Sequence, residues 1–133
     1  MPWTFLDYVD SNGSNQIEAW LESLSPSART LVRPRLATIL AFASPQERLQ
    51  PPRFEALQGL GMFEIKFQLK NVAYRILAWY GPGRKEVTLL AGATKKNDQY
   101  RPPSVLDTAD RRRAEILSDE GRVTTTCLFK ESN

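Results

Sequence analysis

The chain has 133 residues, 41% of them apolar and 25% charged, which is enough for one globular domain with a single core. It contains no histidine and one cysteine, Cys127, which excludes Ser–His and Cys–His catalytic pairs and an intrachain disulfide, and disfavours a metal site. The formal charge of +3 is unevenly spread, because residues 62–113 hold eleven basic and five acidic side chains, and this predicts a polyanion contact on one face.

The N-terminal segment is polar and acidic, which is not the pattern of a signal peptide. Apolar runs such as Ile39 to Ala43 are far shorter than the ~20 residues needed to cross a bilayer. Together with the single cysteine, these features predict a cytoplasmic protein with no membrane partner. The alternating aromatic stretch from Trp3 to Tyr8 predicts an opening strand, followed by a turn over residues 10–14.

Two amphipathic helices are expected next. Asn15 and Glu18 have the spacing of a capping box and precede apolar residues at helical spacing, which predicts a short helix. Ser25 and Pro26 open a second helix, and Pro34 is expected to kink or divide it. Because neither helix is long enough to be stable alone, the two are expected to pack as a helical hairpin.

The period of the apolar pattern changes from 3.6 to 2 after a proline-rich connector over residues 44–53. The first of the following runs alternates apolar and polar side chains, and the second is apolar except for Arg75. Short turns separate the runs, so an antiparallel meander is expected. The predicted strands are residues 63–70, 72–80 and 86–93.

A last helix is predicted because Ser104 and Asp107 suggest another capping box and apolar residues then recur at helical spacing towards Gly121. Residues 123–129 are β-prone and could add an edge strand or stay loose. The predicted fold class is α+β, with an N-terminal helical hairpin packed on an antiparallel β-sheet and a C-terminal helix. The expected parts of this single domain, 1–133, are the opening strand and hairpin (1–53), the sheet (54–101), the helix (102–121) and the tail (122–133).

Arg75 is the most informative single residue. A cation inside an otherwise apolar strand is costly to bury unless it is paired. One interpretation is structural and pairs Arg75 with Glu64 across the strand hairpin. The other is functional and makes Arg75 a phosphate clamp, since a guanidinium presents a bidentate fork to phosphate oxygens.

Other charged residues could belong to the same site. The lysines among them could equally be solvated surface residues, and the arginines could form ion pairs with Asp107 and Asp110. Either of the two carboxylates near the sheet, Glu55 or Glu64, could accept a proton or orient Arg75. Tyr74 and Tyr100 could stack on a base or donate a hydrogen bond, although strand tyrosines belong more often to a core. The candidates are Lys66, Lys70, Lys95 and Lys96 on strands, Arg111, Arg112 and Arg113 on the last helix, and Glu55 and Glu64.

Four segments resemble, in order and spacing, motifs of the phage-derived HigB-type branch of the RelE/ParE toxin superfamily. They are Leu57 to Lys66 (LQGLGMFEIK), Tyr74 to Leu77 (YRIL), Val87 to Lys96 (VTLLAGATKK) and Pro103 to Ala114. The resemblance covers about residues 54–117, with a compatible helical hairpin before it. The chain departs from the family pattern at Lys66, where arginine is usual, at Ala91, where histidine is common, and at Ala93, where phenylalanine is common.

The resemblance implies a RelE-like fold and a toxin that cuts mRNA in the ribosomal A site, with the 2′-hydroxyl attacking its own phosphodiester and no metal or cofactor required. By position, Arg75 would clamp the scissile phosphate, and Lys95 and Lys96 would neutralise the transition state. A carboxylate, Glu64 or Glu55, would take the proton or orient the arginine. The residues that would hold the RNA are Lys66, Lys70, Arg111 and Arg112.

The implied partners are a cognate antitoxin, expected to be of the helix-turn-helix type, the ribosome and mRNA. Three alternatives stay open from the sequence. The chain could be a non-catalytic ParE-like toxin that acts on gyrase or another target, or a degenerate phage protein that only binds its antitoxin. It could also be a general nucleic-acid-binding module, which would bind in a salt-dependent way without cleavage.

Overall fold

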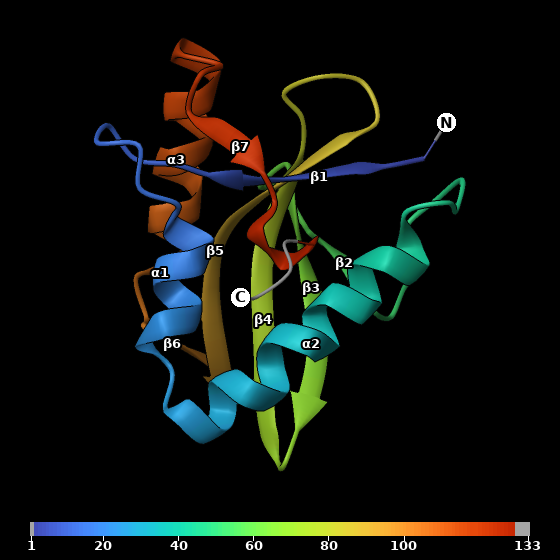
Figure 1. The fold of residues 1–133 in the computed structure, drawn as a ribbon, viewed down its shortest axis with the longest axis vertical. Coiled ribbons are helices and arrows are strands. Elements are labelled where there is room, and N and C mark those ends of the chain that lie inside the picture. The colour runs from blue at the N-terminus through green and yellow to red at the C-terminus, as the bar shows by residue number, and fades with distance from the viewer. Residues whose placement is uncertain (1, 130–133) are drawn as a thin grey trace.

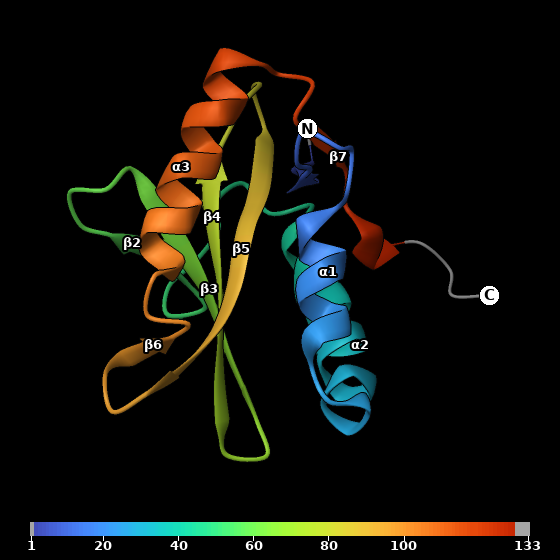
Figure 2. The same ribbon diagram turned by 90° about the vertical axis from the view of Figure 1, so that its left-hand side faces the viewer.

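The computed structural model describes residues 2–129 and has three layers (Figure 1). A helical hairpin covers one face of a twisted sheet, and a third helix covers part of the other face (Figure 2). The predicted α+β class is therefore confirmed. The elements are β1 (Thr4–Tyr8), α1 (Gln16–Ser23), α2 (Pro26–Ala43), β2 (Phe54–Leu57), β3 (Met62–Leu69), β4 (Val72–Tyr80), β5 (Glu86–Lys96), β6 (Gln99–Arg101), α3 (Val105–Ser118), β7 (Val123–Thr125) and a 3-10 turn, η1 (Cys127–Phe129).

The seven-stranded sheet has the order β2-β3-β4-β5-β1-β7, and β6 pairs with the end of β5. The predicted antiparallel meander is present as β3, β4 and β5. The sheet as a whole is mixed, however, because the first strand of the chain, β1, runs parallel to β5, with Thr4 opposite Glu86. The helical hairpin carries the chain across the sheet between β1 and β2. The alternation of apolar residues in a strand does not show whether the strand pairs in a parallel or an antiparallel way.

Both helix caps predicted for the hairpin are present. The Asn15 side chain accepts hydrogen bonds from the backbone N–H of Ile17 and Glu18, and the Ser25 hydroxyl accepts one from Ala28. The expected division of the second helix at Pro34 is wrong, because α2 is continuous from Pro26 to Ala43. Pro34 lies on the exposed side of α2, so the carbonyl that loses its intrahelical partner can face water while buried residues on either side keep the helix packed.

The sheet separates two cores. On the hairpin side, the side chains of Phe63, Ile65 and Phe67 from β3 pack against buried residues of α1 and α2. On the other side, Met62 and Leu77 pack beneath α3. Successive strand residues point to opposite faces, so each strand contributes to both cores, but α3 covers only the part of its face that lies away from the β3–β4 turn.

A bulge in β5 sets which residues face α3. The register shifts between Leu77 and Ala78, which pair with Ala91 and Leu89 and leave Leu90 as the extra residue. Leu90 and Ala91 consequently both lie in the core beneath α3. The shift also places Ala93 on this side, and two residues further along the strand the alternation brings Lys95 to the same face.

The C-terminal segment closes over β1. Of the two possibilities for residues 123–129, the edge strand is present, because β7 pairs with β1. Arg33 of α2 donates to the carbonyl of Cys127, and the buried carboxylate of Asp7 accepts from the Cys127 backbone N–H. Burial raises the pKa of the Cys127 thiol to about 12, so the thiol stays protonated. The end of the predicted tail, residues 130–133, lies outside the described residues.

The capping box expected at Ser104 is not formed. Ser104 precedes α3, but its side chain makes no capping hydrogen bond. The helix is instead held by its apolar side, where Val105, Ala109 and Ile116 are buried against the sheet. Packing therefore stabilises this helix without the predicted cap. None of the helices in residues 2–129 is long and apolar enough to cross a membrane.

Candidate functional site

The part of the sheet that α3 leaves uncovered carries a cluster of polar side chains, here called the basic face. Its residues come from five neighbouring strands, β2 to β6, and share one side of the sheet. Lys66 on β3 lies directly opposite Arg75 on β4, and Lys95 on β5 lies opposite Tyr100 on β6. Glu55 on β2 lies opposite Glu64 on β3. The basic face is therefore Glu55, Glu64, Lys66, Arg75, Lys95 and Tyr100.

Arg75 is contacted by two neighbouring residues, and its side chain is 16% exposed. Its Nε lies 3.8 Å from Oε1 of Glu64, so the predicted ion pair between these residues is present. Its Nη1 donates to the backbone carbonyl of Tyr74 at 2.9 Å. At 3.8 Å the ion pair is too long for a hydrogen bond, and within the described structure the buried Nε has no hydrogen-bond partner. Its Nη2 makes no hydrogen bond with any described residue, so the guanidinium keeps donors for an anionic ligand.

Tyr100 belongs to the cluster as a hydrogen-bond donor, which is one of the roles that the sequence left open for it. Its hydroxyl donates to Oε2 of Glu64 at 2.6 Å, and the ammonium group of Lys95 lies 4.8 Å from the centre of its ring. Burial, followed by this bond to a carboxylate, raises the pKa of the Tyr100 hydroxyl above its ordinary value. The hydroxyl is therefore protonated at neutral pH and acts as a donor that fixes Glu64.

The two carboxylates differ sharply in their surroundings. Glu64 is only 3% exposed, and Arg75 and Tyr100 each approach one of its oxygens. The side chain of Glu55 is 52% exposed, and its contact is the ammonium group of Lys66 at 3.4 Å. Glu64 is thus a buried, fully engaged carboxylate, whereas Glu55 can still meet a ligand from solvent.

A hollow of about 360 Å³ opens beside Arg75 and Lys66, and Arg53 forms part of its wall. Arg53 was not singled out from the sequence, because it ends a proline-rich connector with no periodic pattern. Its Nη1 donates to the backbone carbonyl of Lys66 at 2.7 Å, and its own carbonyl accepts from the Lys66 N–H at 2.8 Å. The connector therefore adds a further cation to the wall of this hollow, beside Lys66 and Arg75.

Several predicted site residues lie elsewhere. Lys96 follows Lys95 directly and so faces the opposite side of β5, where it is exposed. Lys70 lies in the turn between β3 and β4, at a positive φ of 48°. Arg112 braces α3 instead of facing solvent: its Nη1 donates to the Leu90 carbonyl at 2.8 Å. Arg111 is exposed beside Glu115 in the same helix, at 3.8 Å.

The remaining arginine of the run on α3 is also engaged locally. Arg113 pairs with Asp110 at 2.6 Å, as one interpretation of the sequence expected, and donates to the Leu60 carbonyl. The two alanines at which the chain departs from the resembled motif, Ala91 and Ala93, are both buried beneath α3. Within residues 2–129, no three Cys, Asp or Glu side chains converge as a metal-binding group.

The arrangement of the basic face suits a phosphodiester. Lys66, Arg75 and Lys95 share one side of the sheet with two carboxylates, of which Glu64 is buried and Glu55 accessible. Arg53 lines the hollow beside Lys66 and Arg75. Residues 19–114 match the sequence model of the family described as phage derived protein Gp49-like (DUF891), and this range contains every residue of the basic face. No curated protein and no solved structure matches the chain.

Proposed function

Because the chain belongs to the phage-derived Gp49-like family, a RelE/ParE-like family of toxins in toxin–antitoxin systems, we propose that it is the toxin of a type II pair of the HigB branch. Its proposed activity is the cleavage of ribosome-bound mRNA in the cytoplasm without a metal ion, which inhibits translation. Its protein partner is an antitoxin of the helix-turn-helix type. The observation that carries this proposal is Arg75, which pairs with the buried Glu64 and lines a hollow together with Lys66 and Arg53.

Arg75 and Lys66 are suited to hold the scissile phosphate. They lie directly opposite one another on β4 and β3, and both line the same hollow. As the 2′-oxygen attacks phosphorus, negative charge grows on the non-bridging oxygens, and cations that are already in place stabilise it. Removing one such preorganised donor raises the barrier by about 3–4 kcal/mol, which corresponds to a rate loss of about 10²–10³-fold.

The surroundings of the two carboxylates support different roles. Glu64 has both oxygens engaged and would orient Arg75, whereas the accessible Glu55 would accept the proton of the 2′-hydroxyl. The bond between the 2′-oxygen and phosphorus then forms and the bond to the 5′-oxygen breaks. Lys95 would give a proton to the departing 5′-oxygen. The products are a 2′,3′-cyclic phosphate and a 5′-hydroxyl end.

The first test is induced expression in a bacterial host of the wild type, Arg75→Ala and the control Arg84→Ala, with mapping of mRNA 5′ ends. Arg84 is an exposed cation in the turn between β4 and β5, away from the basic face. The wild type and Arg84→Ala should arrest growth and produce cuts within translated codons. Arg75→Ala should produce at least about 100-fold fewer such ends, from the loss of one donor.

Equal growth arrest by the wild type and Arg75→Ala, with intact mRNA in both, would overturn the nuclease assignment and favour a non-catalytic toxin. If the wild type does not arrest growth, the chain would be a protein that only binds an antitoxin. Cuts outside translated regions would show that the chain cleaves RNA without the ribosome.

A further inference from the structure

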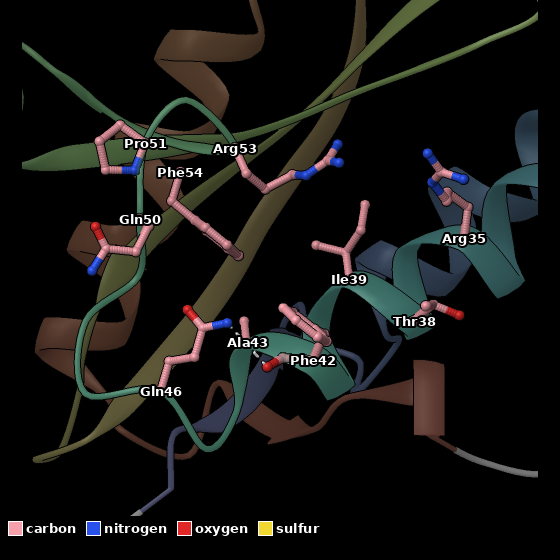
Figure 3. A pocket seen from close by; sticks show the side chains of 10 residues that line it. All are labelled: Arg35, Thr38, Ile39, Phe42, Ala43, Gln46, Gln50, Pro51, Arg53 and Phe54. Carbon is pink, nitrogen blue, oxygen red and sulfur yellow. Dashed lines mark hydrogen bonds between the residues drawn. The ribbon is translucent and has the colours of Figure 1, made fainter.

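A second hollow of the molecule, here called the groove, shares only Arg53 with the hollow beside Arg75. It lies between α2 and the chain leading into β2 and has a volume of about 420 Å³ (Figure 3). Ile39 and Ala43 of α2 and Phe54 of β2 supply its apolar walls. Phe42 lines the same groove and is 76% exposed, the largest exposure among the large apolar residues of the described chain. A phenylalanine that exposed costs free energy in water and favours a contact that covers it.

One end of the groove carries two arginines. Figure 3 shows the side chain of Arg53 extending above Ile39 towards the part of α2 that carries Arg35. Arg35 is exposed and makes no hydrogen bond or ion pair with any residue in 2–129, while the contact of Arg53 is with the Lys66 carbonyl. Both guanidinium groups therefore retain donors for a ligand.

The charge around the groove is uniform in sign. The helix α2 contains three arginines and no acidic residue, and residues 26–54 as a whole contain five arginines and one glutamate. This is a second concentration of positive charge, distinct from the one in residues 62–113. An occupant of the groove must therefore combine a bulky apolar side chain, which covers Phe42 and Phe54, with carboxylates that reach Arg35 and Arg53.

We propose that this groove is the docking site of the antitoxin, which inserts an apolar side chain flanked by aspartate or glutamate; the identity of the partner rests on the toxin assignment made above. The apolar walls favour a protein over RNA, because RNA would be held mainly by its phosphates and would leave Phe42 uncovered. The positive charge of the groove also favours an acidic partner over a second copy of this chain, since a two-fold contact would bring two identical patches with net positive charge together.

The groove and the basic face lie on different sides of β2. Phe54 faces the hairpin core, whereas the next residue, Glu55, belongs to the basic face. Arg53 alone lines both hollows. An antitoxin seated in the groove would thus leave Arg75 open and meet the RNA-binding side only at Arg53. The toxin would then be neutralised by an obstacle to ribosome binding, with its reacting groups uncovered.

The test measures affinity by calorimetry, with the purified product of the reading frame adjoining this chain's gene as the probe. Phe42→Ser removes the exposed apolar anchor, and Leu117→Ser removes an apolar residue that is 66% exposed on the outer side of α3 and serves as its control. Arg35→Glu reverses a charge in the groove, and Arg84→Glu reverses one in the β4–β5 turn. We expect each groove variant to weaken binding by about tenfold or more, as for an interface hot spot, and each control by less than about twofold.

Wild-type affinity in both groove variants, or no binding of the probe to the wild type, would overturn the proposal. So would a loss of ribosome co-sedimentation in Arg35→Glu with unchanged affinity for the probe, since the groove would then be an RNA contact. A wild type that is dimeric beside a monomeric Phe42→Ser would also overturn it, in favour of a second copy. Because affinity is measured without RNA, the result is readable whether or not the chain cuts mRNA.

Discussion

The two faces of the sheet are made from the same strands but have opposite characters. On the hairpin face, β3 and β4 contribute a continuous apolar surface that α1 and α2 cover. On the α3 face, the same strands are apolar only beneath α3, and towards the β3–β4 turn they carry Lys66, Arg75 and the buried Glu64. One face of this sheet therefore holds the fold together, while the incomplete cover of the other face leaves charged groups fixed but accessible.

The largest expected effect on stability comes from the hairpin face. Leu36→Ala truncates a fully buried side chain of α2 and should lower the free energy of unfolding by about 2–5 kcal/mol, through lost burial and a residual cavity. Urea or guanidinium denaturation measures the change. An unfolding free energy of Leu36→Ala within about 0.5 kcal/mol of the wild type would contradict the role of the hairpin face in holding the fold together.

Substitutions of the two carboxylates on the α3 face should affect the stability of the fold and the cleavage of RNA differently. Glu55→Gln removes an exposed partner of Lys66 and should change the free energy of unfolding by less than about 1 kcal/mol. If Glu55 is the base, the same change should slow RNA cleavage by about 10²-fold or more. Glu64→Gln should destabilise the fold more, by about 1–3 kcal/mol, since it leaves Arg75 without its buried counter-charge. Full cleavage by Glu55→Gln would assign the base elsewhere.

The hairpin side contains one buried acid that provides a pH test. Burial raises the pKa of Asp7 above its ordinary 3.8, despite hydrogen bonds from the Cys127 backbone and Asn15. The folded state then binds more protons than the unfolded state, so the unfolding free energy should fall as pH rises, by up to about 1.4 kcal/mol per pH unit between the two pKa values. Denaturation from pH 4 to 8 should show a flatter profile for Asp7→Asn. Parallel profiles would contradict this role.

The smallest predicted effect concerns Tyr100. Tyr100→Phe removes the donor to Glu64 and leaves a carboxylate oxygen without that bond, which should lower the free energy of unfolding by about 1–2 kcal/mol. The rate of cleavage at saturating substrate should also fall, because Tyr100 holds Glu64 and Glu64 orients Arg75. A decrease in stability with unchanged cleavage at saturating substrate would limit Tyr100 to a structural role.

The sequence was a good guide wherever a regular period was long enough to be seen. The alternation in β3 predicted the apolar side of that strand, which packs in the hairpin core, and the pairing of Arg75 with Glu64 was one of the two interpretations of Arg75. The strands β2 and β6 have four and three residues, which is too short for a period. Arg53, in the connector before β2, was therefore missed, and Tyr100 was considered without Glu64 as its partner.

Other differences arise from tertiary context. Pro34 does not divide α2, because the burial of flanking residues such as Val32 and Leu36 outweighs one missing hydrogen bond. Lys95 and Lys96 are adjacent in one strand, so only one of them can share a face with Arg75. The parallel pairing of β1 depends on where the helical hairpin returns the chain, which no local pattern encodes.

The most direct test of the central claim uses purified chain and ribosomes programmed with a defined mRNA, followed by analysis of the RNA ends. The account predicts a cut within the ribosome-bound codon that leaves a 2′,3′-cyclic phosphate, in the wild type and in Arg84→Ala, with cleavage by Arg75→Ala reduced by about 10²-fold or more. Equal cleavage by Arg75→Ala, or intact mRNA with the wild type, would contradict the assignment of the basic face as a site of RNA cleavage.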